Sequence, residues 1–299
     1  MISAGVKLLI GATAIGFAPI FAKLLIVDGS VSPVASGFWR MFIGSLGFLL
    51  LLIFGKDWQR SRSEVLRIMS NSFVIVLLAG FLFAADLVAW HTSFLYTSVG
   101  VSSIIANFSA VFVPITGIVF FRERLRTNVV YGGLLAFVGF IGLTYLKSKQ
   151  ASTDGALSHQ EFIGELLAFL TAFFYTGYIL AIKSLATRYS SRVLMLLASS
   201  ISALILGAIM VVSGPAIIPQ GALGWVWALC LGLISQVFGQ GLVASSLSVL
   251  PAGQSALILL WAPVSSALFG WIFLGEILNS GQIISMIVAV FGIALVVQK

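Results

Sequence analysis

The stretch FFRERLRTNVVYGGLLAFVGFIGLTYL (Phe120–Leu146) has a second copy in the chain, IFLGEILNSGQIISMIVAVFGIALVVQ (Ile272–Gln298). The copies align at a shift of 153 residues, the difference between Glu123 and Glu276. Identical pairs at this shift include Glu123 with Glu276, Leu125 with Leu278, Ala136 with Ala289, Gly139 with Gly292, Gly100 with Gly253, and Ser102 with Ser255. Chance similarity between two apolar sequences is the alternative. The repeated spacing from glutamate to glycine favours a duplicated unit.

The composition is that of a membrane protein. Of the 299 residues, 60% are hydrophobic and only 8% are charged, and the mean hydropathy is +1.14. Apolar blocks of about 20 residues recur, and each is long enough to cross roughly 30 Å of hydrocarbon as a helix. The blocks are continuous and do not alternate, which favours helices over a barrel. The first block, 8–27, has no clear cleavage site and is interpreted as a membrane helix rather than a signal peptide.

The hydrophobic pattern predicts ten spans joined by short segments. They cover about 5–27, 33–54, 72–95, 99–121, 128–146, 162–186, 192–213, 221–246, 252–273 and 280–297. The longest joins, 55–71 and 147–160, are too short to hold a soluble domain. The fold class is therefore an all-α membrane protein.

Basic residues predict the orientation. They gather in the joins after spans 2, 4 and 6, at Lys56, Arg60, Arg62, Arg67, Arg122, Arg124, Arg126, Arg188 and Arg192. The opposite side has only Lys147 and Lys149 in its joins. The positive-inside rule then places both termini in the cytoplasm of a multi-pass inner-membrane protein. The net charge of +7 is explained by this bias, so nucleic acid is not an expected partner.

The duplication predicts two inverted halves. Residues 1–148 and 161–299 each hold five spans, with 149–160 as a linker. An odd number of spans inverts the second half, as in transporters whose halves exchange conformations around a central site. The spans at 128–146 and 280–297 contain almost no polar residues and are expected at the periphery. Lys23 and Lys183, which correspond at a shift of 160, are expected to extend toward opposite membrane surfaces.

The chain resembles the EamA-type branch of the drug/metabolite transporter superfamily. The resemblance covers nearly the whole sequence and rests on the duplicated five-helix unit and on ADLVAWHTSFLYTSVGVSSIIANFSAVFVPITGIVFFRERL, residues 85–125. One departure is Ala110, where such proteins usually carry proline; Pro263 keeps it in the second half. The resemblance implies a transporter, typically an exporter of amino acids or related metabolites. The family is broad, so the substrate does not carry over.

Charged residues inside the predicted spans are candidates for coupling or gating. Asp86 and Arg40 lie at similar predicted depth, and an ionised side chain there is costly, so a pair between them is expected. A static salt bridge, a role in coupling to protons, and direct substrate contact all remain open for Asp86. His91, five residues further on, is expected near the outer interface with access to water.

Polar and aromatic residues of several spans are candidates for a substrate-binding cavity near the midplane. They are Trp90, Asn107, Tyr175, Tyr178, Gln236, Gln240 and Trp261. Such groups suit a mainly apolar pocket with a few orienting polar atoms. Helix–helix contact is the alternative for each of them, and an outer aromatic belt is the alternative for Trp90.

The sequence therefore predicts a secondary transporter that moves a small organic solute by alternating access. The alternative is a membrane-embedded structural or lipid-handling protein without transport of its own. An enzyme is not expected, because two histidines and one deep acid supply no catalytic cluster. No metal site or cofactor is expected: Cys230 is the only cysteine, and no phosphate-binding loop is present. The expected partners are the solute, the lipid bilayer and, as a candidate coupling ion, the proton; the protein is expected to be a monomer or homodimer.

Overall fold

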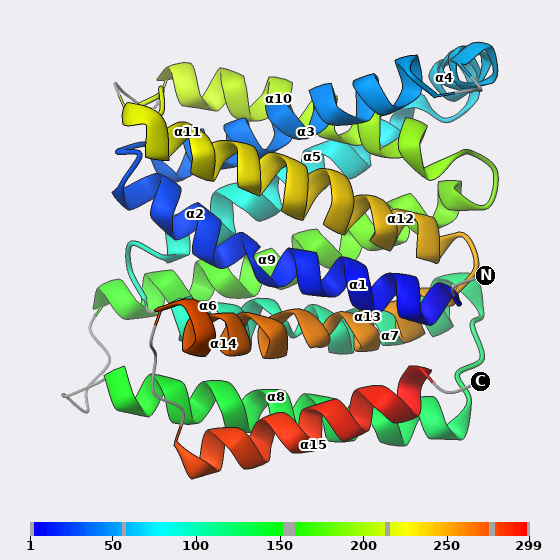
Figure 1. Ribbon diagram of the computed structural model, residues 1–299. Coiled ribbons are helices and arrows are strands. Elements are labelled where there is room, and N and C mark those ends of the chain that lie inside the picture. The colour runs from blue at the N-terminus through cyan, green and yellow to red at the C-terminus, as the bar shows by residue number, and fades with distance from the viewer. Residues whose placement is uncertain are drawn as a thin grey trace.

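The computed structural model is a bundle of roughly aligned helices (Figure 1). It describes residues 3–55, 58–97, 99–151, 159–212, 216–274 and 279–297. The helices of the first half are α1 (Ala4–Gly16), α2 (Ala18–Val27), α3 (Pro33–Ile53), α4 (Trp58–Asn71), α5 (Phe73–Ser93), α6 (Val99–Ala106), α7 (Ser109–Phe121) and α8 (Thr127–Ala151). Those of the second half are α9 (His159–Ala186), α10 (Ser191–Val212), α11 (Gly221–Cys230), the π-helix η1 (Leu231–Gln240), α12 (Gly241–Leu247), α13 (Ala252–Leu259), α14 (Trp261–Leu274) and α15 (Ser280–Val297).

Most of the predicted spans are long apolar helices. In the described part of the chain, eight segments are long and apolar enough to cross a membrane. The spans predicted at 99–121 and 128–146 correspond to the shorter apolar helices Ser109–Phe121 and Thr127–Gly142. The chain is therefore an all-helical, multi-pass membrane protein over these residues.

Two helices are broken at equivalent places in the two halves. The helix predicted over 99–121 is interrupted at Asn107 and Phe108, between α6 and α7. The helix predicted over 252–273 is interrupted at Leu260, which is 153 residues after Asn107. The first break forms although Ala110 replaces the usual proline. The duplication is thus visible in the backbone as well as in the sequence.

The join predicted over 55–71 contains a helix, α4. Its buried face consists of Ser61, Glu64 and Ile68, which follow one another at helical spacing. The Glu64 carboxylate accepts a hydrogen bond from Ser190 N at 2.9 Å and pairs with Arg60 at 3.4 Å. These contacts attach α4 to the turn between α9 and α10, so the segment is not an open loop.

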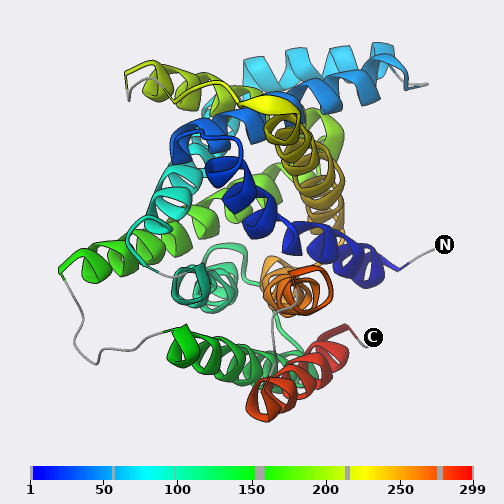
Figure 2. The ribbon, with the colours of Figure 1, turned by 60° about the vertical axis from the view of Figure 1, so that its left-hand side comes forward.

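Helices α8 and α15 form a pair at one side of the bundle, as predicted for two spans with few polar residues (Figures 1 and 2). They run antiparallel, and their glycines pack reciprocally. A Cβ built on Gly139 would lie 2.4 Å from Ala289 N, and one built on Gly292 would lie 2.3 Å from Ala136 N. Real Cβ atoms do not approach backbone so closely, so both positions need glycine. At the shift of 153, Gly139 corresponds to Gly292 and Ala136 to Ala289, so the two contacts are equivalent in the repeat.

A similar close approach joins α3 to η1. A Cβ on Gly44 would lie 2.5 Å from the Gln236 side chain, and one on Gly232 would lie 2.5 Å from Ile43. The sequence predicted one regular helix over 221–246, whereas its middle is a π-helix. Such segments are rare and are frequent at functional sites. Both Gln236 and Gln240 belong to it and are buried.

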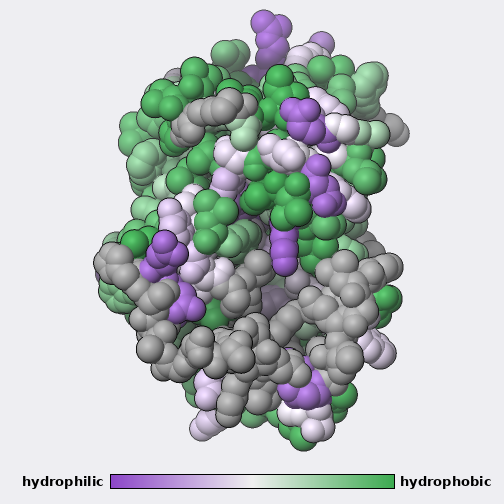
Figure 3. Space-filling view, turned by 90° about the vertical axis from the view of Figure 1, so that its left-hand side faces the viewer, coloured by the Kyte–Doolittle hydropathy of each residue, from purple (hydrophilic) through white to green (hydrophobic). Residues whose placement is uncertain are grey.

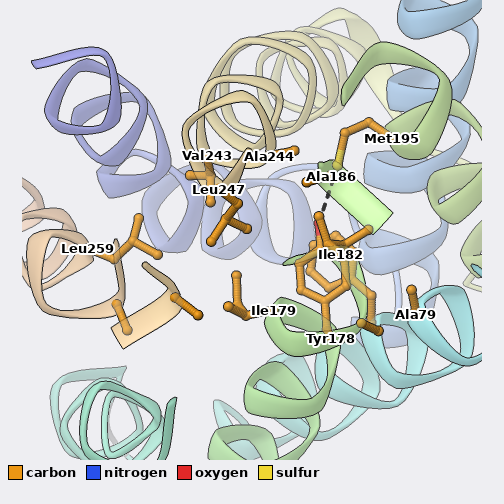
Figure 4. Close-up of a cluster of buried hydrophobic side chains, with 14 of the residues drawn as sticks. Ala79, Tyr178, Ile179, Ile182, Ala186, Met195, Val243, Ala244, Leu247 and Leu259 are labelled. Atoms are coloured by element: carbon orange, nitrogen blue, oxygen red, sulfur yellow. Dashed lines mark hydrogen bonds between the residues drawn. The ribbon is translucent and has the colours of Figure 1, made fainter. Parts of the chain in front are cut away.

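The interior between α9, α10, α12 and α13 is filled with apolar side chains (Figure 4). Tyr178, Ile179 and Ile182 of α9 are fully buried there, close to Met195 of α10 and Leu247 of α12. Tyr178 Oη donates a hydrogen bond to Met195 Sδ at 3.4 Å. The same buried cluster includes Met41 and Phe83 of the first half, so the core is continuous across the two halves.

Both termini lie at the same end of the bundle as α4 (Figure 1). The turns between α7 and α8 and between α9 and α10 are at this end too, so the described basic joins share one face. Figure 3 shows the opposite end, where hydrophilic side chains reach the surface among hydrophobic ones and the face is hollowed near its middle. In the following, the two ends are called the terminal end and the far end.

Candidate functional site

Arg40 of α3 is buried in the middle of the bundle, with 3% of its surface exposed. Its Nε donates a hydrogen bond to Gln236 Oε1 at 3.2 Å, and Gln236 Nε2 donates to Ser199 Oγ at 3.1 Å. The guanidinium carbon lies 5.6 Å from the centre of the Phe83 ring, within reach of a cation–π interaction. Among the described residues, no acceptor is assigned to its two terminal nitrogens.

Asp86 of α5 is also buried, with 5% of its surface exposed. The expected salt bridge with Arg40 is wrong, because the two side chains are not in ion-pair contact. Arg40 is instead held by Gln236 and by Phe83, one turn before Asp86. The two charges still influence one another electrostatically. The site therefore holds a guanidinium group and a carboxyl group that do not contact each other directly.

His91 is fully buried, which contradicts its expected place at a wet interface. Its Nδ1 lies 3.3 Å from Pro33 O, at the start of α3, and its ring packs near Trp90 and Phe94. The beginning of α3 covers this end of α5. Sequence position alone placed His91 near the end of the span, but not beneath a neighbouring helix.

Six of the seven predicted cavity residues, all except Trp90, divide into two groups. Tyr178 stacks on Phe83 with ring centres 4.2 Å apart, Tyr175 lies 5.8 Å from Tyr178, and Gln240 is next to Tyr175. These residues, with Gln236, surround the Arg40 region from α5, α9 and η1.

Asn107 and Trp261 lie at the helix breaks. Asn107 Nδ2 donates to Ser103 O at 2.7 Å within its own helix, and Trp261 Nε1 donates to Thr13 Oγ1 at 2.8 Å. Trp261 thus joins α14 to α1. Its indole nitrogen serves a helix–helix contact in this structure.

Four buried polar atoms have no hydrogen-bond partner in the described structure. They are Ser36 Oγ, Trp90 Nε1, His91 Nε2 and Gln240 Oε1. Buried polar atoms are nearly always satisfied, so each such atom requires an explanation. These four belong to α3, α5 and η1, the same three elements that carry Arg40, Asp86 and Gln236. The clustering identifies this region as the candidate site.

A second arrangement, here called the clasp, lies at the terminal end. Glu123, in the join after α7, accepts hydrogen bonds from Ala252 N at 2.7 Å and Gly253 N at 3.1 Å, the first turn of α13. Lys183 Nζ donates to Leu247 O at 2.9 Å and Leu250 O at 2.6 Å, at the end of α12. The turn between α12 and α13 is therefore held from both sides.

Lys183 lies in the last turn of α9, and its extension toward a membrane surface stays a prediction. Its ammonium group satisfies the carbonyl of Leu247, which ends α12 and lacks an intrahelical partner, and that of Leu250 in the turn that follows. The repeat equivalent, Lys23, is exposed, and no hydrogen bond is assigned to it within the described ranges. Glu276, the equivalent of Glu123, lies outside the described residues. The repeated glutamate was the sequence signal for the clasp.

The described residues contain no group of three histidine, cysteine, aspartate or glutamate side chains that could hold a metal ion. Arg40, Asp86 and the amides of the candidate site offer hydrogen bonding and electrostatic attraction.

Comparison with known proteins identifies the family. The model of the EamA-like transporter family matches residues 3–145 and again residues 162–298. The chain belongs to the EamA-like transporter family. The family model thus matches once in each half, which confirms the resemblance seen in the sequence. EamA-like proteins are membrane transporters, so the transport of small solutes is the function that the family supports.

A solved structure has the same fold. It is titled only "Crystal structure of protein", and it superposes with a TM-score of 0.78 at 18% identity, covering 98% of this chain and 96% of that chain. At this identity, the likeness shows the EamA-like fold alone. No curated protein matches the chain.

Proposed function

We propose that this EamA-like protein is a secondary transporter that moves a small organic solute across the inner membrane by alternating access. An amino acid or a related metabolite or drug is the proposed solute, and export is the proposed direction. The observation that carries the proposal is that α3, α5 and η1, which hold Arg40, Asp86 and Gln236 in the interior, also carry four buried polar atoms without partners among the described residues. An ionised side chain near the bilayer centre costs about 2.5–3.5 kcal/mol even on the mildest scale. A protein can retain buried ionisable side chains despite this cost when they line the path of a polar solute.

The unpaired guanidinium and carboxyl groups suggest the chemistry of the solute. The free nitrogens of Arg40 suit a carboxylate, for which the guanidinium fork is a strong partner. Asp86 suits an ammonium group, and Gln240 Oε1 offers a further acceptor. The stacked Phe83 and Tyr178 supply an apolar wall. A molecule with both an acidic and a basic group would satisfy more of this site than an ion of either sign.

Two features support alternating access. The equivalent helices α8 and α15 run antiparallel with reciprocal glycine contacts, which is expected for inverted halves related by a two-fold axis in the membrane plane. The clasp is made at the terminal end by Glu123 and Lys183, whereas Lys23 at the far end is exposed. We therefore infer a state that is closed at the terminal end. With the termini in the cytoplasm, this state faces outward.

Protons are the proposed coupling ion, with Asp86 as the proton carrier. An intramembrane carboxylate without a direct counter-charge can bind and release a proton as its surroundings change. If Asp86 couples transport to protons, Asp86→Asn should abolish the response to a pH gradient, and it should also weaken binding of a solute that carries an ammonium group. An unchanged pH response of a folded Asp86→Asn protein would exclude this role.

The competing proposal is a structural or lipid-handling membrane protein. It predicts no saturable flux of any water-soluble solute. The test is a thermal-shift screen of amino acids and related metabolites on the purified protein, followed by uptake of the stabilising solute into liposomes. We expect saturable uptake that is lost in Arg40→Gln and kept in Arg188→Gln, an exposed arginine at the terminal end. A solute that stabilises the protein but never crosses the membrane would contradict the proposal.

A further inference from the structure

We propose that a groove on the outside of the bundle binds one anionic phospholipid, with an acyl chain in the groove and the phosphate on Arg192. The groove lies between α3 and η1, near the terminal end, and has a volume of about 500 Å³. Its walls are formed by Leu50, Leu51 and Phe54 of α3 and by Leu233 and Val237 of η1, with Arg192 at its margin. This site does not depend on the transport function, because it faces away from the candidate solute site.

The groove is shaped and lined for a hydrocarbon chain. Its floor forms because Gly47 lets α3 approach η1; a Cβ there would lie 2.6 Å from Val237 Cγ2. Leu50, Leu51 and Leu233 are 53%, 47% and 45% exposed, so their side chains border open space and not the core. In a multi-pass membrane protein, this space is occupied by lipid. A groove between helices offers an acyl chain more contact than a smooth helix surface does.

Arg192 places a positive charge at the margin of the groove. It is the second residue of α10, its side chain is exposed, and it has no hydrogen-bond or ion-pair partner among the described residues. The guanidinium rests against the end of α3, since a Cβ on Gly55 would lie 3.5 Å from Arg192 Nη1. An arginine fork can bind a phosphate group through two hydrogen bonds. An apolar groove that ends at such a group matches a molecule with an apolar tail and an anionic head.

The charges around this margin favour an anionic headgroup over a zwitterionic one. Arg62 and Arg67 on the neighbouring helix α4 are exposed and add positive potential at this end. The acid of α4, Glu64, is already engaged by Ser190 N and Arg60, and is buried. Basic surfaces between membrane helices on one side of a membrane are typical sites for anionic lipid headgroups.

Native mass spectrometry of the full-length protein in detergent tests the proposal, with phosphatidylglycerol and phosphatidylcholine as probes. We expect one phosphatidylglycerol to bind in preference to phosphatidylcholine. Arg192→Gln should lower the affinity for phosphatidylglycerol about fivefold, the effect of one basic residue at a membrane surface. Arg192→Lys should retain most of the preference. Arg188→Gln, which removes the same charge four residues earlier, in the turn before α10, should leave it unchanged.

A second pair of variants tests the groove. Leu233→Trp should fill it and reduce binding of both lipids, whereas Ile234→Trp, at a neighbouring position with 38% exposure, should not. Soluble glycerol phosphate should not compete, because it lacks the acyl chain. Three results would overturn the proposal. They are equal binding of the two lipids, an unchanged lipid preference in Arg192→Gln, and full competition by glycerol phosphate. If Arg192→Gln does not fold, the Leu233→Trp comparison still decides it.

Discussion

Replacing Glu123 by alanine should open the terminal end of the protein. The carboxylate accepts hydrogen bonds from Ala252 N and Gly253 N at 2.7 and 3.1 Å, so the change leaves two amide groups of α13 without partners. Loss of a helix cap costs about 1 kcal/mol, and hydrogen bonds to a charged group are worth roughly 1.5–3 kcal/mol each when buried. Glu123 is half-buried, so we expect the closed state to lose about 2 kcal/mol, which shifts the equilibrium roughly 30-fold.

Cysteine labelling measures this shift. The background is Cys230→Ala, which removes the only cysteine. The reporters are Ala256→Cys, one turn inside the clasp, and Ser103→Cys, its equivalent in the first half at a shift of 153. With Glu123→Ala, labelling should accelerate about 10- to 30-fold at Ala256→Cys and should slow at Ser103→Cys. Glu165→Ala, which removes an acid from α9 away from the clasp, is the control.

The labelling rates of the two reporters, compared with each other, distinguish the possible explanations. If both reporters react faster, Glu123 only stabilises the fold. If neither changes, the two hydrogen bonds do not hold the terminal end closed and the reasoning is refuted. An acceleration at one reporter with a slowing at the other is expected only when the two ends open in alternation.

Three further predictions concern the site, the packing and the topology. Arg40→Gln should remove the thermal stabilisation by the solute, whereas Arg40→Lys should retain part of it; equal stabilisation of all three proteins would exclude Arg40 as a ligand. Gly139→Leu and Gly292→Leu should each lower the yield and the unfolding temperature, because α8 and α15 must separate by more than an ångström. The alanine variants should lower both by less. A leucine variant as stable as wild type would contradict the packing. With the termini in the cytoplasm, Gln59→Cys should be protected from an impermeant thiol reagent in intact cells and Gln220→Cys should be labelled, and the reverse pattern would invert the orientation.

The helices and their duplication could be predicted because both depend on short-range patterns. Apolar runs of membrane-spanning length determine the spans, and the repeated interval from Glu123 to Gly139 reveals the second copy. The glycine pair at Gly139 and Gly292 was visible in the sequence as a repeat. Only the structure shows that each glycine packs on the other copy's alanine.

The contacts of the site could not be predicted in the same way. Arg40 and Gln236 are far apart in sequence, and the π-helix changes the direction of the side chains that a regular helix would present. The depth of Asp86 in the membrane was estimated from its position along one helix. That position does not show which side chain of a neighbouring helix faces Asp86. His91 and Lys183 were placed by their distance from helix ends, but each is covered or engaged by a neighbouring element. The corrections all arise from packing between helices.

Trans-stimulation in liposomes tests the central claim most directly. Purified protein is reconstituted, the vesicles are loaded with unlabelled solute chosen by thermal shift, and the initial uptake of the labelled solute is measured. Alternating access predicts that internal solute accelerates uptake, because the loaded protein returns faster than the empty one, and that Arg40→Gln abolishes the acceleration. Uptake that rises in proportion to the external concentration, is indifferent to the internal solute and is unchanged in Arg40→Gln would contradict the account.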